Sequence, residues 1–239
     1  MQEQMQENLT KAKSLLSSRN FWIAVLIVAF IIVVFVAMNN KKKKDEQESY
    51  VKKLLKDKIS EQELELNQYL RKLFSDHTFW IRMYMISYVN NSKDLNVTTE
   101  RLLKNQEQIG RAIGIWYGDK EGKKVTNLFK ENLISFGEAL KEMTAKNKNG
   151  VIVADRRWNE SCEKIAEYMA EINPQIEKAE LMQNFRRHCE LISEMVGNRF
   201  KNKFKEETIA FDKANNHAMY EIANTITKGI VKQFPDKFN

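Results

Sequence analysis

An unbroken apolar run near the start of the chain limits the possible folds more than any other feature. The run begins at Phe21, ends at Met38, and contains 18 side chains without one polar position. As a helix it rises about 27 Å, close to the thickness of the hydrocarbon core of a bilayer. Its backbone polar groups are then all satisfied within the segment, as hydrocarbon requires. We therefore expect a transmembrane helix, with Trp22 near the membrane interface.

A cleaved signal peptide is the alternative reading of this run. Signal peptides have an apolar core of about 7–15 residues, followed by a cleavage site made of small residues. Here the run is longer, and Asn39, Asn40 and Lys41 follow it. Its length and its flank both favour an anchor that is retained.

The charges beside the run predict its orientation. Lys41, Lys42, Lys43 and Lys44 follow it in succession, whereas only three basic residues precede it. The positive-inside rule places the domain after the run on the cytosolic face, and the four lysines also suit anionic lipid headgroups.

Cysteines and glycosylation sequons bear on the same question. Cys162 and Cys189 match no metal or redox motif, and two reduced thiols fit a cytosolic domain. The sequons at Asn90, Asn96 and Asn159 offer a test, because glycans are added only to segments that face a lumen.

The rest of the chain has a helical pattern. Only 8 glycines and 2 prolines occur in 239 residues, and apolar side chains recur at steps of three and four. We expect breaks in a polar stretch after residue 89, in a three-glycine turn near residue 118, in a connector at 146–150, at Asn173-Pro174, and at Gly197. Val151–Val153 is the one short strand candidate.

The predicted fold is all-α: an antiparallel helical bundle of about five to six helices behind a single N-terminal transmembrane helix. The expected parts are a polar segment at 1–20, the transmembrane helix at 21–38, a basic flank and charged helical stalk at 39–65, and the bundle domain at 66–239.

A search for catalytic chemistry gives one weak candidate pocket. His77, Trp80 and Arg82 lie within two turns of one predicted helix, and a pocket on the bundle would combine them with three residues from later helices: His188, Asp212 and His217. The alternative is that these side chains tie the helix to the bundle, with Arg82 paired to a carboxylate, and we favour that reading.

Motifs for catalysis and for cofactors are missing from the sequence. No His has a Glu three residues before it, which excludes the helical di-iron pattern, and no His-Glu-x-x-His, phosphate loop or nucleophile elbow occurs. We predict no catalytic residue, no metal site and no cofactor.

Four segments together resemble an uncharacterised all-helical family of bacteria and large DNA viruses. They begin at Phe74, Leu102, Trp158 and Gly229, and read FSDHTFWIR, LLKNQEQIG, WNESCEKIA and GIVKQFP. The resemblance covers about residues 70–238 and implies a compact helical domain, here joined to a membrane anchor. The family's recurring polar positions correspond to His77, Trp80, Arg82, Asn105, Tyr117, Gly118, His188, Asp212 and His217. Many relatives have a histidine where this chain has Asn132, which argues against a histidine-rich site.

Three functional hypotheses follow. In the leading one, a single-pass membrane protein uses its bundle to bind other proteins at the membrane surface. The resemblance extends this to a large DNA virus with an internal membrane, where the protein would link membrane to capsid shell as a minor capsid component. The second is a membrane-tethered enzyme or small-ligand or metal binder that uses the His77 pocket. The third, a nucleic-acid binder, is the least favoured, because the net charge of +7 is spread over 39 basic and 32 acidic residues.

Overall fold

The computed structural model describes residues 8, 37–42, 44–45 and 60–238. It divides the chain into two units, Met1–Ile59 and Ser60–Asn239. In the first unit, residues 37–42 and 44–45 are helical and exposed, and they include Met38 and three of the flanking lysines.

Most of the apolar run lies outside the described residues, and so do Phe21, Trp22 and Lys43. In the part of the chain that is described, no helix combines the length and the apolar character needed to cross a bilayer. The transmembrane helix therefore stays a prediction from the sequence.

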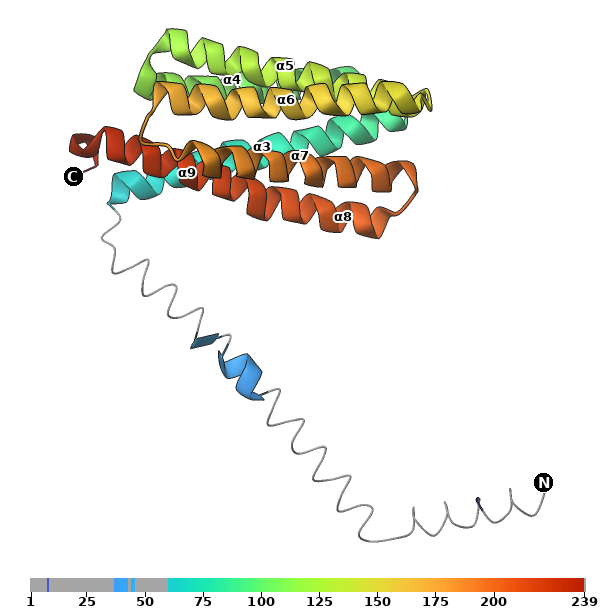
Figure 1. The fold of residues 1–239 in the computed structure, drawn as a ribbon, viewed down its shortest axis with the longest axis horizontal. Helices are drawn as coiled ribbons and strands as arrows, with labels where there is room; N and C mark the ends of the chain where they lie inside the picture. The colour runs from blue at the N-terminus through green and yellow to red at the C-terminus, as the bar shows by residue number, and fades with distance from the viewer. Residues whose placement is uncertain (1–7, 9–36, 43, 46–59, 239) are drawn as a thin grey trace. The chain divides into compact units, whose positions relative to one another are not determined.

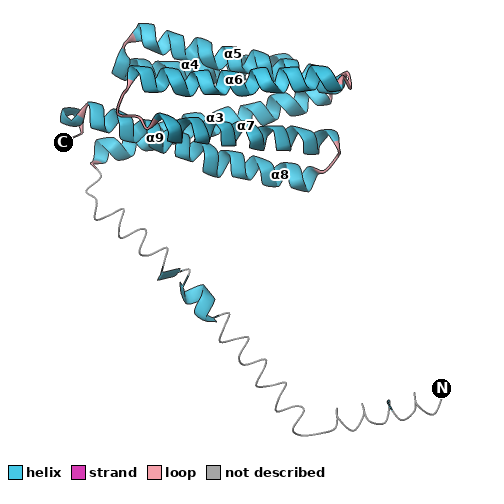
Figure 2. Ribbon diagram, in the orientation of Figure 1, coloured by secondary structure: helices cyan, strands magenta, loops and turns pink. Residues whose placement is uncertain are grey.

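The regular structure of the second unit is entirely helical, which confirms the predicted all-α bundle (Figures 1 and 2). A π-helical turn, Ala214–Ala218, joins the last two α-helices into one continuous rod, so six rods make up this unit as described. A short 3-10 helix, Pro235–Lys237, follows the last rod. The α-helices are α3 (Glu61–Val89), α4 (Leu95–Tyr117), α5 (Asp119–Thr144), α6 (Lys148–Ile172), α7 (Lys178–Phe200), α8 (Phe204–Lys213) and α9 (Met219–Gln233).

The six rods pack as a closed ring. Each helix from α3 to α7 packs against the next one along the chain, α7 packs against α8 and α9, and α9 returns to α3. Short connections make neighbouring helices antiparallel, as Figure 1 shows. The ring closes because the long last rod lies beside the first helix of the unit.

Large side chains fill the centre of the ring. Phe129 of α5 lies 6.2 Å, centroid to centroid, from both Phe74 of α3 and Phe185 of α7. The buried apolar side chains between Leu66 and Phe238 form one contiguous cluster. Burial of this apolar surface is the main force that holds the bundle together.

Glycines draw α4 and α5 unusually close together. A Cβ added to Gly110 would lie 2.5 Å from the carbonyl oxygen of Gly122, and one added to Gly122 would lie 2.9 Å from the Cα of Gly114. Only Gly118, with φ of 89°, makes the turn between the two helices. The predicted three-glycine turn is therefore wrong, because the glycines on either side of Gly118 serve helix packing instead.

The helix end predicted at Gly197 was also wrong, and the one short strand candidate is helical. Gly197 lies inside α7, which continues to Phe200, and the chain turns at Asn202 with φ of 56°. Asparagine tolerates this left-handed conformation, so no glycine is needed there. The short strand candidate Val151–Val153 belongs to α6, where the helical register of Ala154 and Trp158 buries one face.

Candidate functional site

His77 is buried in the centre of the bundle. It lies on α3, is 2% exposed, and its Nδ1 is 3.1 Å from Oε1 of Gln106 on α4. The amide nitrogen of Gln106 donates to the carbonyl oxygen of Leu102 at 2.8 Å. Oε1 of Gln106 is therefore an acceptor, which assigns the proton of the neutral imidazole to Nδ1.

His188 of α7 is the neighbour of His77 in this interior. The two ring centroids are 5.7 Å apart, and His188 is 2% exposed. Neither of its ring nitrogens has a hydrogen-bond partner. The sequence-predicted pair His77 and His188 thus does come together, across 111 positions of the chain.

Burial keeps both imidazoles neutral. It lowers the pKa of His77 to about 4, against a smaller upward contribution from the hydrogen bonds to Gln106 and Asn105. It also lowers the pKa of His188 well below the ordinary value of 6.5, and the nearby His77 adds to this effect. Both neutral imidazole rings are buried, so a substrate in solvent does not reach them. Among the described residues no group of three or more metal-ligating side chains gathers anywhere.

Arg82 lies in a second polar cluster, which also involves α7. Its Nε donates to Oε1 of Glu207 at 2.8 Å, and Nη1 of Arg199 lies 3.1 Å from Oε2 of the same carboxylate. Glu207 is 1% exposed. Arg82 is thus paired to a carboxylate, as predicted by the alternative in which these side chains tie the helix to the bundle. Glu207 and Arg199 were missed, because nothing in the charged stretch around residue 207 marks one glutamate as buried.

The Trp80 side chain is partly exposed at the surface of the bundle and does not line a pocket with His77. The guanidinium of Arg101 lies 4.8 Å from the Trp80 ring centroid, and Arg101 is also 3.8 Å from a carboxylate oxygen of Asp76. Asp212 and His217 are exposed on the last rod. The structure therefore divides the six candidate residues among a sealed interior, an ion pair and two surface locations.

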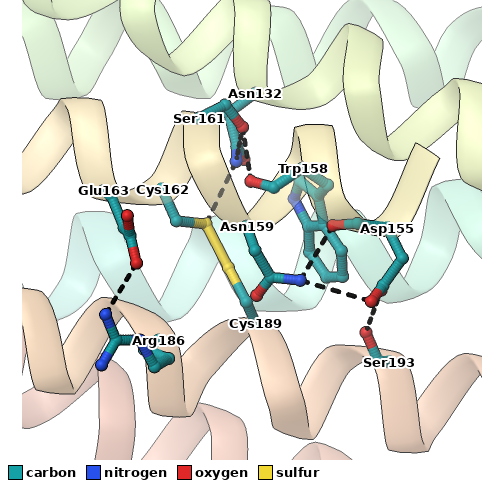
Figure 3. Close-up of a disulfide and its surroundings, with 10 residues drawn as sticks. All are labelled: Asn132, Asp155, Trp158, Asn159, Ser161, Cys162, Glu163, Arg186, Cys189 and Ser193. Carbon is teal, nitrogen blue, oxygen red and sulfur yellow. Dashed lines mark hydrogen bonds and ion pairs between the residues drawn. A yellow bond between two sulfur atoms is a disulfide. The ribbon is translucent and has the colours of Figure 1, made fainter. Parts of the chain in front are cut away.

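The two cysteines form a disulfide that links α6 to α7, and the expected pair of reduced thiols is not what the structure shows. Figure 3 shows Cys162 and Cys189 between the two helices, beside Trp158. Asn132 of α5 donates to the Oγ of Ser161 at 2.8 Å, and its Nδ2 is 3.2 Å from the Cys162 sulfur. Asn132 thus supports the packing of α5 on α6.

Open grooves occur on the surface. One of about 440 Å³ lies over the glycine contact of α4 and α5, lined in part by Arg111, Lys123 and Lys130. Another of about 320 Å³ lies between α3 and α9, beside Arg71 and Tyr220. Arg71 donates to the Asn224 side chain at 2.8 Å, so a neutral amide already engages this guanidinium.

Comparison with protein-family models, with curated proteins and with solved structures finds no match for this chain.

Proposed function

We propose that this chain is a single-pass membrane protein whose helical bundle binds other proteins at the membrane surface. In a large DNA virus with an internal membrane, it would be a minor capsid component between that membrane and the capsid. The run from Phe21 to Met38 carries the proposal, because 18 consecutive apolar residues suit a bilayer core and four lysines follow at once.

The side chains in the interior of the bundle favour a structural role for this domain over a catalytic one. The residues that most resembled a site, His77 and His188, are each 2% exposed, and the His77 ring packs against both His188 and Phe129. Arg82 has its charge balanced by Glu207. His77 and His188 join α3 to α7, and the Arg82–Glu207 ion pair joins α3 to α8, so these side chains contribute to holding the bundle together.

The disulfide and the lysine flank have different implications for orientation. Lysines after the run favour a cytosolic bundle, whereas disulfides persist in oxidising surroundings such as the exterior of cells and virions. A virion component reconciles the two: the bundle folds on the cytosolic face with both thiols reduced. Once the particle has left the cell, Cys162 and Cys189 together lose two electrons and two protons to an extracellular oxidant such as dioxygen and form the disulfide. Free thiols in infected cells and a disulfide in released particles are the expected result of thiol labelling.

Membrane extraction tests the anchor. Full-length protein should stay in the pellet after alkaline carbonate and be released by detergent. A variant that lacks residues 21–38 should become soluble, while a control that lacks residues 1–20 should behave as the full chain. Full-length protein that is soluble without detergent would refute the proposal.

Sequon use tests the orientation. Asn90 is exposed at the end of α3 and Asn96 is exposed in the first turn of α4, so they are accessible acceptors, whereas Asn159 is half-buried within α6. With a cytosolic bundle, translation in the presence of microsomes should leave both exposed sequons unmodified. Glycans at these sites would place the bundle in the lumen, where the disulfide would form directly.

Detergent stripping of purified particles tests the viral role. The protein should remain with the capsid fraction when the membrane is removed under mild conditions. Its absence from purified particles would remove the capsid assignment and leave the membrane-anchored interaction role to be judged by extraction alone.

A further inference from the structure

Three connections at one end of the bundle are built in the same way. In each, a residue with positive φ ends the helix: Asn91 (47°), Lys146 (56°) and Asn202 (56°). The next backbone N–H then donates to the carbonyl oxygen five residues back, at 2.9 Å from Ser92, 3.0 Å from Asn147 and 2.9 Å from Lys203. This is the Schellman pattern, which fixes the direction of the chain as it leaves a helix.

These three connections gather at one end of the bundle. Figure 1 shows the α3–α4, α5–α6 and α7–α8 connections together at the right, with the start of α3 and the C-terminus at the left. The chain enters the bundle at Ser60, so the three connections lie at the end far from that entry point. With 26 residues, α5 separates the two ends by about 39 Å. We call residues 90–97, 145–149 and 201–206 the distal tip.

The distal tip is strongly basic. It holds six lysines and only two acidic residues, Asp94 and Glu206. All six lysines are exposed, and within the described part of the chain none of them forms an ion pair. They are Lys93, Lys146, Lys148, Lys201, Lys203 and Lys205.

The opposite end has the opposite charge. Its terminal segments, residues 60–65, 118, 173–177 and 234–238, contain five acidic residues and one lysine. These terminal segments therefore differ in charge, and an anionic surface is attracted more strongly to the distal tip than to the segments at the opposite end.

Large apolar side chains stand exposed among the tip lysines. Val97 is 67% exposed at the first connection, Ile152 is 69% exposed just after the second, and Phe204 is 53% exposed at the third. Each connection thus presents lysine together with an apolar side chain. Lysine beside apolar residues is the combination that binds to the interface of an anionic membrane.

We propose that the distal tip docks on an anionic lipid bilayer. All six cations are lysines, which are depleted from protein–protein interfaces but suit phosphate headgroups as mobile point charges. Phe204 is the one aromatic residue in the tip, whereas single-stranded nucleic-acid sites need several aromatic platforms. This contact is separate from the predicted transmembrane anchor, and it gives the chain a second attachment to lipid.

Flotation of reconstituted protein tests the proposal. Full-length protein in phosphatidylcholine nanodiscs is mixed with vesicles of phosphatidylcholine alone or of equimolar phosphatidylcholine and phosphatidylserine. We expect binding only to vesicles that contain phosphatidylserine, and binding that weakens as salt is raised. If the protein fails to enter nanodiscs, that result would refute the predicted transmembrane anchor but not the lipid contact of the distal tip. The protein is then mixed with the same vesicles without nanodiscs, and its flotation is measured.

Matched charge variants locate the contact. The tip variant carries Lys93→Gln, Lys148→Gln and Lys205→Gln, one from each connection and none at a positive φ. Each lysine near an anionic surface contributes about 1 kcal/mol to binding, so the loss of three lysines should lower the partition coefficient of the variant about a hundredfold. The control carries Lys120→Gln, Lys123→Gln and Lys124→Gln on exposed positions of α5 and should bind as the wild type does.

Apolar variants give a second readout. Ile152→Ser with Phe204→Ser should weaken binding about tenfold at high salt, where the lysine contribution is screened. Ile134→Ser, at a 64% exposed position in the middle of α5, is the control. Equal binding to both vesicle types, or equal loss in the tip and α5 charge variants, would overturn the proposal. So would a tip that prefers polyglutamate or duplex DNA over vesicles, since it would then serve an acidic protein or a nucleic acid.

Discussion

Two polar clusters lie along α3 and α7, and they differ in whether their buried ionisable groups carry a charge. The charged cluster, Arg82, Arg199 and Glu207, balances one buried carboxylate with two guanidiniums. The imidazole cluster, His77, Gln106 and His188, contains no charge at neutral pH. Both nitrogens of His188 lack a hydrogen-bond partner, as does Nε of Arg199 in the charged cluster. The comparison shows that burial is tolerated in two ways: by pairing a charge, or by keeping a titratable group neutral.

The largest expected effect comes from breaking the charged cluster. Glu207→Leu removes the carboxylate and leaves two guanidiniums without their partner, 27% and 14% exposed. Loss of one member of a buried ion pair costs about 3–5 kcal/mol, and the partial exposure of the arginines places this variant near 3 kcal/mol. Thermal unfolding of full-length protein in mild detergent measures it. The neighbouring exposed Glu206→Leu should change stability by less than about 0.5 kcal/mol. Equal effects of the two variants would mean that the charged cluster does not stabilise the fold.

Acid should destabilise the imidazole cluster. The pKa of His77 is about 4 in the folded protein and 6.5 when unfolded, so between these values the unfolded state binds more protons. Stability is therefore full above pH 6.5 and falls as the pH drops toward 4, by about 3 kcal/mol from this residue. The depressed pKa of His188 acts in the same direction.

Unfolding free energies measured across that pH range check this expectation. His77→Gln should flatten the dependence, while His217→Gln, at an exposed position on the last rod, should keep the wild-type slope. A wild-type stability that stays constant between pH 6.5 and pH 5 would contradict a neutral buried His77.

The sequence was informative about the helices and less so about their ends. Apolar steps of three and four predicted the six rods, because each helix buries one face. The helix end placed at Gly197 was wrong, since nothing within 4 Å of a Cβ there requires glycine and Asn202 makes the turn instead. The tight contact at Gly110 was also missed, because close packing of two helices leaves no local sequence signal beyond the glycine itself.

The candidate site was foreseen only in part. His77 and His188 were both assigned to the candidate pocket from their residue type, but their contact depends on α7 lying near α3 in the closed ring, which spacing along the chain does not encode. Glu207 was missed because its neighbours Lys205 and Glu206 are exposed and share its polar character. Asp212 and His217 were included for their residue types, and only the folded rod shows that they face outward.

The smallest effects separate the two histidines from each other. His77→Leu leaves the carbonyl oxygen of Gln106 buried without its donor, which should cost about 1–2 kcal/mol. His188→Leu removes two ring nitrogens that have no partner and replaces them with apolar volume, so it should raise stability by about 1 kcal/mol. Both variants are measured at a pH above 6.5, where protonation does not contribute. A loss on His188→Leu as large as that on His77→Leu would show that the nitrogens of His188 are satisfied, and the imidazole cluster would then contain no unpartnered ring nitrogen on His188.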